Sequence, residues 1–203
     1  MTFFLCHSMP DSAFPTSASA LVGRRILLGV SGSIAAYKAA PLTRLLVQAG
    51  AEVQVLLTES ATAFVTPLTL GTLSKKPVLS GFLRDAAAGE WHNHVELGLW
   101  ADALLIAPAS ANTIGQLANG LCPNLLCAVY LSARCPVFLA PAMDLDMYAH
   151  PAVTQNLARL CSFGNHVFES PSGELASGLR GPGRMLEPED IVAELEKFFE
   201  EKN

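Results

Sequence analysis

Charged residues are scarce in this sequence: Asp, Glu, Lys and Arg make up 15% of the 203 residues, whereas apolar residues make up 51%. The formal net charge is −5, which argues against nucleic acid or an anionic membrane surface as a partner. A local pocket for a nucleotide-type cofactor needs no basic surface and is compatible with this balance. The apolar excess predicts a large buried parallel sheet or extensive contacts between subunits.

Long hydrophobic runs and paired cysteines are also missing. No apolar run reaches the roughly 18 residues that a membrane-spanning helix requires. The five cysteines form no C-x-x-C pair and no metal-ligand spacing, so we expect no metal site and buried thiols in a reducing compartment. Residues 18–20 resemble a signal cleavage site, but the basic start of a secretory signal is lacking. We predict a disordered tail over residues 1–22 and a cytoplasmic protein.

The sequence does contain a regular alternation of short apolar segments and helical patterns. The short segments are continuously apolar, which is typical of strands buried on both faces of a parallel sheet. We therefore predict a single α/β domain over residues 23–203, built on a doubly wound parallel sheet. The predicted strands cover 25–30, 52–57, 77–80, 103–108, 136–141 and 165–169, and the predicted helices cover 34–48, 66–73, 110–119, 123–132, 152–160 and 189–202.

The segments between these elements carry three further expectations. Pro41 lies inside the first predicted helix, so it should kink the helix or mark an irregular turn. Residues 85–89 are expected to form a loop, and residues 91–102 lead directly into the strand at 103–108. Residues 170–184 are rich in Gly and Pro and predict a mobile flap.

Three polar corners follow predicted strands, at residues 31–33, 58–62 and 110–113. The carboxyl ends of parallel strands meet at one edge of a sheet, so these corners should hold one phosphorylated ligand there. Gly32 would let the backbone approach the ligand closely, and Ser31 and Ser33 could donate hydroxyl hydrogens. The G-x-G-x-x-G dinucleotide motif is absent, and each corner can also be explained as a simple helix cap.

His94 is the candidate acid–base residue, because it precedes a strand aimed at the same edge of the sheet. Spacing alone would favour an ordinary surface or interface histidine at this position. No comparable argument applies to His92, His150 or His166, and no two histidines have metal-ligand spacing.

Five motifs in this order resemble those of the flavin-containing cysteine decarboxylases, and most closely the phosphopantothenoylcysteine decarboxylases of coenzyme A biosynthesis. The resemblance covers roughly residues 23–189. The motifs are Gly32-Ser-Ile-Ala-Ala-Tyr-Lys38, His94-Val-Glu-Leu with Trp100-Ala-Asp102, Pro108-Ala-Ser-Ala-Asn-Thr113, Ala140-Pro-Ala-Met143 and Gly183-Arg-Met185.

The resemblance implies a Rossmann-like, flavodoxin-like subunit that binds FMN at a subunit interface of a homotrimer or dodecamer. His94 matches the active-site histidine of the family. The substrate would contact Met143, Asp144 and Arg184. The implied FMN-binding residues are Gly32, Ser33, Ile34, Thr58, Phe64, Ser110, Ala111, Asn112, Thr113 and Ala142.

The family reaction oxidises the CH₂–SH group of 4′-phosphopantothenoylcysteine toward a thioaldehyde, while a hydride passes to FMN. The thioaldehyde acts as an electron sink, so CO₂ leaves, and the resulting enethiol is reduced and protonated to give 4′-phosphopantetheine. In many bacteria this domain is fused to a phosphopantothenoylcysteine synthetase. A fused or separate synthetase is therefore an expected partner.

Two residues depart from the family pattern. Asp144 replaces an Asn that binds the substrate carboxylate, so its carboxyl group must be protonated, displaced or bonded to a donor such as Arg184. Ser177 replaces the flap cysteine that protonates the enethiol, and a hydroxyl is a much poorer acid than a thiol with a pKa of about 8.5. Besides the coenzyme A reaction, two alternatives therefore stay open: oxidative decarboxylation of a peptide's C-terminal cysteine, and an idle FMN-binding regulatory subunit.

Overall fold

The central sheet has five parallel strands in the order β2-β1-β5-β6-β7. The structure is a computed structural model that describes residues 19–85 and 88–202. In order of position along the chain, this strand arrangement is 2-1-3-4-5, the flavodoxin-like doubly wound order, and its switch point lies between β1 and β5. The predicted fold class is therefore confirmed. The strands are β1 Arg25–Val30, β2 Glu52–Leu57, β5 Ala103–Ala109, β6 Val137–Pro141 and β7 His166–Val167.

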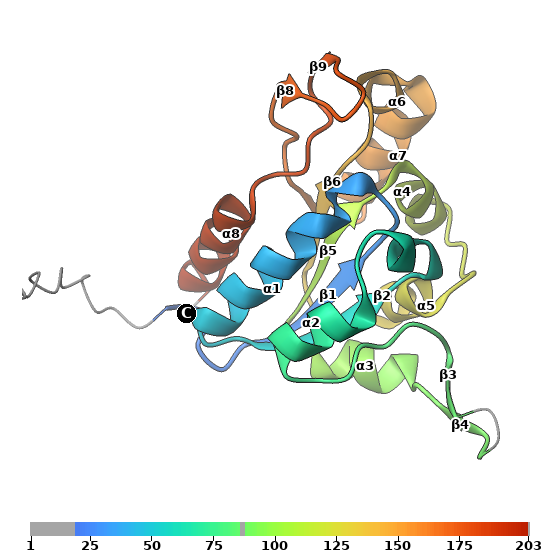
Figure 1. The fold of residues 1–203 in the computed structure, drawn as a ribbon, viewed down its shortest axis with the longest axis vertical. Coiled ribbons are helices and arrows are strands. Elements are labelled where there is room, and N and C mark those ends of the chain that lie inside the picture. The colour runs from blue at the N-terminus through green and yellow to red at the C-terminus, as the bar shows by residue number, and fades with distance from the viewer. Residues whose placement is uncertain (1–18, 86–87, 203) are drawn as a thin grey trace, which may run out of the picture.

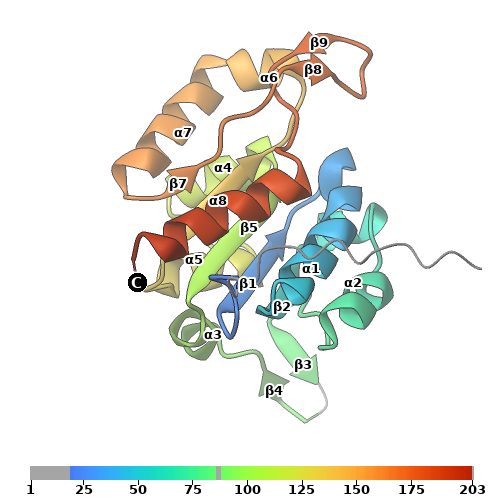
Figure 2. The same ribbon diagram turned by 90° about the vertical axis from the view of Figure 1, so that its left-hand side faces the viewer.

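Helices cover both faces of the sheet (Figures 1 and 2) and bury a separate apolar cluster on each. Helices α1 (Ala39–Gln48), α2 (Pro67–Ser74) and α8 (Pro188–Glu200) contribute to one cluster. Helices α4 (Ala111–Ala118), α5 (Leu125–Ser132) and α7 (Pro151–Ser162) contribute to the other. Residues 103–107 of β5 alternate between the two clusters, which is why this part of the strand is continuously apolar.

The packed domain begins before the predicted boundary at residue 23. Leu21 is fully buried in the cluster that contains α1, so residues 19–22 belong to the domain and not to a tail. The rest of the predicted tail, residues 1–18, lies outside the described residues. Pro41 lies in the first turn of α1, where proline is tolerated, and the 3₁₀ helix η1 (Ile34–Lys38) directly before it supplies the predicted irregular turn.

The segment between α2 and β5 differs from the prediction. Residues 77–80 form only an isolated bridge, Leu56 to Leu79, and two short strands, β3 (Leu83–Asp85) and β4 (Glu90–Trp91), pair as a hairpin. Residues 94–100 form helix α3 (His94–Trp100), capped by the Asn93 side chain, in the segment that was expected only to lead into the next strand. Gly98 explains this packing, because a Cβ there would lie 2.8 Å from the Ser132 carbonyl oxygen of α5.

Two small elements at the other end of the sheet were not predicted. The short helix α6 (Leu145–Ala149) follows β6 directly. Within the expected flap, β8 (Gly173–Glu174) pairs antiparallel with β9 (Arg180–Gly181) to form a hairpin. Among the described residues, no helix is both long enough and apolar enough to cross a membrane.

Candidate functional site

Ser31 joins the two strands at the switch point. Its buried hydroxyl donates to the Pro108 carbonyl oxygen at 2.7 Å and accepts from the Ser110 backbone N–H at 2.9 Å. The only hydroxyl hydrogen is therefore used within the fold, and the expectation that Ser31 could donate it to a ligand is wrong. Ser31 instead holds the ends of β1 and β5 together, so that the loops that follow them have a defined spacing.

The loop after β1 presents Ser33 at the start of η1. The Ser33 hydroxyl is partly exposed and accepts from the Ala35 N–H at 3.3 Å, so its own hydrogen stays available. Gly32 is needed for a reason that the sequence did not reveal. A Cβ at Gly32 would lie 2.5 Å from Ser60 Oγ, so the missing side chain makes room for the 3₁₀ helix η2 (Glu59–Ala63).

The loop after β5 forms the N-terminus of α4, as predicted. Ser110 is its N-cap: Oγ accepts from the Thr113 N–H at 3.3 Å and donates to Thr113 Oγ1 at 3.2 Å. The N–H groups of Ala111 and Asn112 belong to the first helical turn and lack intrahelical acceptors, which makes the turn suitable for an anion. Thr58, at the end of β2, is buried and hydrogen-bonds Ser60, whereas Phe64 is half-exposed.

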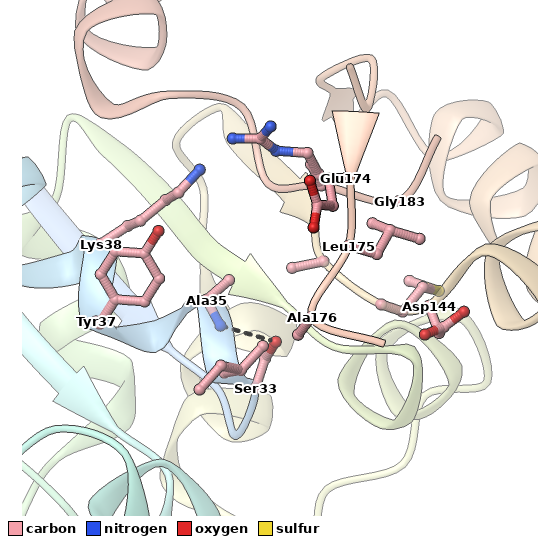
Figure 3. Close-up of a pocket in the computed structure, with 13 residues that line it drawn as sticks. Ser33, Ala35, Tyr37, Lys38, Asp144, Glu174, Leu175, Ala176 and Gly183 are labelled. Carbon is pink, nitrogen blue, oxygen red and sulfur yellow. Dashed lines mark hydrogen bonds between the residues drawn. The ribbon is translucent and has the colours of Figure 1, made fainter. Parts of the chain in front are cut away.

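A cavity of about 560 Å³ opens between η1, the β6–α6 junction and the flap hairpin (Figure 3). This volume is typical of small-molecule sites. Six residues predicted for cofactor or substrate binding line it, whereas Thr58, Phe64 and residues 110–113 do not. Those six are Ser33, Ile34, Ala142, Met143, Asp144 and Arg184.

Asp144 acts as the N-cap of α6, since its Oδ1 accepts from the Leu145 N–H at 2.7 Å. From the sequence, we expected the Asp144 carboxyl group to be protonated, displaced or bonded to a donor. The structure shows a bond from a donor, and that donor is the backbone amide of Leu145. Arg184 donates instead to Glu187 Oε1, at 3.0 Å. The expected contact between Arg184 and Asp144 is therefore not made.

Ser177 lies at the exposed tip of the flap, next to Ala176, which lines the cavity. The base of the flap is anchored to the rim of the sheet. The buried Ser170 hydroxyl donates to the Arg184 carbonyl oxygen at 2.8 Å, and the Gly183 carbonyl oxygen accepts from the Met143 N–H at 2.9 Å. That the flap is mobile stays a prediction.

His94 does not line the cavity of its own chain. Helix α3 lies at the amino end of the sheet, and the flap strands lie at the opposite end (Figures 1 and 2). Helix α3, which begins at His94, therefore lies away from the ligand edge of its own chain, and the catalytic role of His94 stays a prediction. Its Nδ1 is buried without a hydrogen-bond partner among the described residues, and its ring lies 5.7 Å from the Trp91 ring.

One charged residue at the cavity wall, Lys38, was assigned no role from the sequence. The Lys38 side chain is only 7% exposed, and its Nζ donates to Glu187 Oε1 at 2.8 Å and to the Met185 carbonyl oxygen at 3.1 Å. The hydrogen bond from Lys38 lowers the pKa of Glu187, and Arg184 adds to the effect. Lys38 stands in the motif at residues 32–38, which was a usable signal, but its partner lies 149 residues further along the chain.

No group of three or more His, Cys, Asp or Glu side chains suited to a metal ion occurs in residues 19–85 or 88–202. The site therefore consists of a helix-terminus corner that suits an anion and an adjoining cavity with charged groups on its far wall.

Comparison with known proteins defines this class of site. The Flavoprotein family pattern matches residues 16–200. A solved cysteine-to-serine mutant of PPC decarboxylase, complexed with pantothenoylaminoethenethiol, is 35% identical with a TM-score of 0.78, covering 88% of this chain and 99% of that one. The chain belongs to the Flavoprotein family, and within it to the FMN-dependent cysteine decarboxylases of the phosphopantothenoylcysteine decarboxylase type. The family predicted from the motifs is confirmed.

Two curated relatives have different activities in their names. The coenzyme A biosynthesis bifunctional protein CoaBC of Vibrio vulnificus (strain YJ016) is 47% identical over 90% of this chain and 45% of its own length. A cysteine/cysteine sulfinic acid decarboxylase from an unknown prokaryotic organism is 62% identical over 68% of this chain and 38% of its own length. The chain thus spans less than half the length of these relatives.

Proposed function

We propose that this chain is an FMN-dependent carboxy-lyase that converts 4′-phosphopantothenoylcysteine to 4′-phosphopantetheine in coenzyme A biosynthesis. The observation that carries the proposal is the cavity beside the flavodoxin-like switch point, in a chain with the motifs and similarity of a decarboxylase. Bound FMN would supply the redox chemistry, namely reversible hydride exchange with the carbon that bears the substrate thiol.

The residues at the switch point fit FMN. Ser33 and the first turn of α4 offer hydroxyl and N–H donors to its phosphate, while Gly32 and Thr58 shape the loops around them. Ile34 and Ala142 line the adjoining cavity and would give apolar contacts to the ring of FMN. Phe64, which follows the loop that begins at Thr58, has an exposed side chain. This donor set carries no carboxylate, which suits a phosphate group.

The substrate lies on the flap side, against Met143, Asp144 and Arg184. Asp144 is held at the α6 N-terminus, where the helix favours a carboxylate, so its negative charge is partly offset. Ser177 at the flap tip takes the place of the proton donor. Because a hydroxyl is a much weaker acid than a thiol, protonation of the enethiol is slow. In support, a PPC decarboxylase whose cysteine was changed to serine was solved with pantothenoylaminoethenethiol, an enethiol.

His94 completes the site from a second copy of the chain. It cannot act at its own cavity, and it stands beside exposed apolar side chains of Trp91, Val95 and Leu99. Burial of these side chains against a partner would place the catalytic histidine at a subunit interface with FMN. We therefore propose a homo-oligomer, either a trimer or a dodecamer.

The partners follow from the same function. The relatives named CoaBC are bifunctional, and this chain matches less than half of their length. A phosphopantothenoylcysteine synthetase, fused or separate, is thus the proposed partner, the substrate is a small molecule, and the reaction takes place in the cytoplasm. We propose no nucleic-acid or membrane partner.

A second candidate is decarboxylation of free cysteine or cysteine sulfinic acid, which the name of the 62% identical relative favours. The oxidative peptide reaction finds a weaker parallel in the peptidyl-cysteine decarboxylase EpiD, which is 26% identical with a TM-score of 0.73. The idle-subunit alternative has a parallel in the FMN binding protein AtHal3, which is 34% identical.

The test is product analysis by mass spectrometry after incubation of the FMN-loaded protein with phosphopantothenoylcysteine, cysteine or a peptide with a C-terminal cysteine. Loss of CO₂ alone from phosphopantothenoylcysteine supports the proposal, and loss of CO₂ with two hydrogens indicates the oxidative reaction. If the protein converts only cysteine, the proposed function is wrong and the second candidate, decarboxylation of free cysteine, is supported. A His94→Asn variant should keep its flavin and lose decarboxylation, whereas normal turnover would remove His94 from the mechanism.

A further inference from the structure

We propose that Glu187 is a positioning residue that holds Arg184 at the cavity, so that the free N–H groups of Arg184 bind an anionic group of the substrate. This inference rests on the proposed function and adds a residue to it. Glu187 has no place in the motifs that identify the family.

One carboxylate oxygen joins two cations. Glu187 Oε1 accepts from Lys38 Nζ at 2.8 Å and from Arg184 Nη2 at 3.0 Å. Lys38 is almost fully buried and is also bonded to the Met185 carbonyl oxygen, so it cannot follow Glu187 into solvent without losing that bond. The acidic oxygen is therefore held in one place, at the start of α8.

Arg184 is restrained from its other side by the flap. A Cβ at Gly173 of β8 would lie 2.6 Å from Arg184 Nη1 and 2.8 Å from Arg184 Cδ. The arginine thus lies directly against the backbone of Gly173, with Glu187 bonded to the opposite nitrogen. A guanidinium held on two sides keeps one orientation.

Most of the hydrogen-bonding capacity of Arg184 is unused. A guanidinium has five N–H donors, and Glu187 is the acceptor that Arg184 reaches among the described residues. The Arg184 side chain is 39% exposed and lines the cavity. The two other carboxylates of the lining do not bind it: Asp144 caps α6, and Glu174 is exposed on β8 (Figure 3).

An unused, oriented guanidinium at a cavity wall suits a phosphate or carboxylate, which it can bind through two parallel hydrogen bonds. Lys38 also lines the cavity, but it is almost fully buried and two of its N–H groups bond Glu187 and the Met185 carbonyl oxygen, so its role is to hold Glu187 while Arg184 contacts the ligand. The negative charge that Glu187 places between the two cations also keeps Lys38 and Arg184 from repelling each other.

The test measures the steady-state kinetics of the FMN-loaded protein and its binding of 4′-phosphopantetheine by calorimetry. Glu187→Gln keeps the size of the side chain and removes its charge. We expect KM and the Kd for 4′-phosphopantetheine to rise about tenfold, as for loss of a charged hydrogen bond, with kcat, flavin content and melting temperature near wild type. Glu187→Asp should recover part of the affinity. Glu189→Gln, two residues away on the exposed face of α8, is the matched control and should change neither constant.

Gly173→Ala gives an independent variant, because it displaces Arg184 and leaves every charge in place. It should raise KM and Kd in the same direction, whereas Gly81→Ala, where a Cβ meets nothing within 4 Å, should not. In an Arg184→Gln background, Glu187→Gln should have no further effect on Kd, since Glu187 acts through Arg184.

Three results would overturn the inference: unchanged KM and Kd in both Glu187→Gln and Gly173→Ala, a lower melting temperature without a change in affinity, or additive effects of the Glu187 and Arg184 substitutions. A wild-type protein that fails to bind 4′-phosphopantetheine would overturn it as well. A protein that binds this product and does not decarboxylate the substrate would refute the proposed function alone, since calorimetry still tests the positioning.

Discussion

The two walls of the cavity are built differently. The wall at the switch point is held by backbone groups and by the buried hydroxyl of Ser31, which joins the ends of β1 and β5. The wall opposite is held by partly exposed charges, Arg184 and Glu187, and by a flap hairpin of two short strands. Buried hydrogen bonds permit little movement, while exposed ion pairs contribute little stability and exchange readily with water. We infer that the first wall is a fixed frame for the cofactor, whereas in the second wall the flap hairpin can adapt to the substrate around the oriented Arg184.

The largest expected loss of stability comes from Gly183→Ala, which disturbs the base of the flap in the second wall. Gly183 has φ of +130°, and a Cβ there would lie 2.4 Å from the Met143 carbonyl oxygen. Both the backbone conformation and the clash with a backbone atom are unfavourable, so we expect a loss of about 3 kcal/mol or more. Chemical denaturation measures the loss of folding free energy, and the Kd for the substrate measures the effect on the cavity. Wild-type values of both would show that the flap base is not a rigid attachment.

Ser31→Ala removes the hydroxyl that joins β1 to β5 in the first wall. The variant loses the hydrogen bond to Pro108 and leaves the Ser110 N–H without its acceptor, so we expect a loss of about 2 kcal/mol and a weaker hold on FMN. Urea denaturation and flavin titration check the two parts. If stability falls and FMN affinity does not, the first wall is not the frame for the cofactor.

Asp102→Asn provides a reference far from both walls, at the amino ends of β1 and β5. Asp102 accepts from the Arg25 backbone N–H at 2.8 Å and from its guanidinium at 3.0 Å. The hydrogen bond from Arg25 lowers the pKa of Asp102 below its usual 3.8. We expect a loss of about 1 kcal/mol for this partly exposed pair, with FMN and substrate affinities unchanged.

The pH dependence of that loss has a defined sign. Because the folded-state pKa is depressed, the stabilisation is fully present above pH 3.8 and disappears as the pH falls through the lower folded value. Denaturation curves of wild type and Asp102→Asn should therefore converge in acid. Curves that stay apart at low pH would mean that the side chain stabilises the fold by packing rather than by charge.

The smallest effect on stability is expected for Ser33→Ala. Its hydroxyl caps η1 at 3.3 Å and is partly exposed, so we expect a loss of about 0.5 kcal/mol. The same change should weaken FMN binding clearly, because Ser33 lines the cavity and its hydroxyl only accepts a hydrogen bond within the fold, which leaves its hydrogen for the ligand. Comparison with Ser31→Ala separates a hydroxyl that holds the frame from one that contacts the cofactor.

Much of the sheet was predictable because its signals are local. The bounds of β1 and β2 agree with the predicted 25–30 and 52–57, and Thr66 caps α2 with Pro67 in its first turn, as a capping signal predicts. Helix α3 was missed because its apolar residues also suit an extended segment, and its close packing on α5 depends on Gly98. The flap strands have two residues each, too short to show any periodicity.

The sequence by itself determined the order of the five sheet strands and of the six larger helices, the polar corners after the strands and the family, because each is written in consecutive residues. Only the tertiary structure decided what those residues do. It used the Ser31 hydroxyl to bond a strand end 77 residues away, and it placed Glu187 between Arg184 and a lysine 149 residues earlier in the chain. Contacts between residues so far apart form when the sheet assembles, and no local pattern records them.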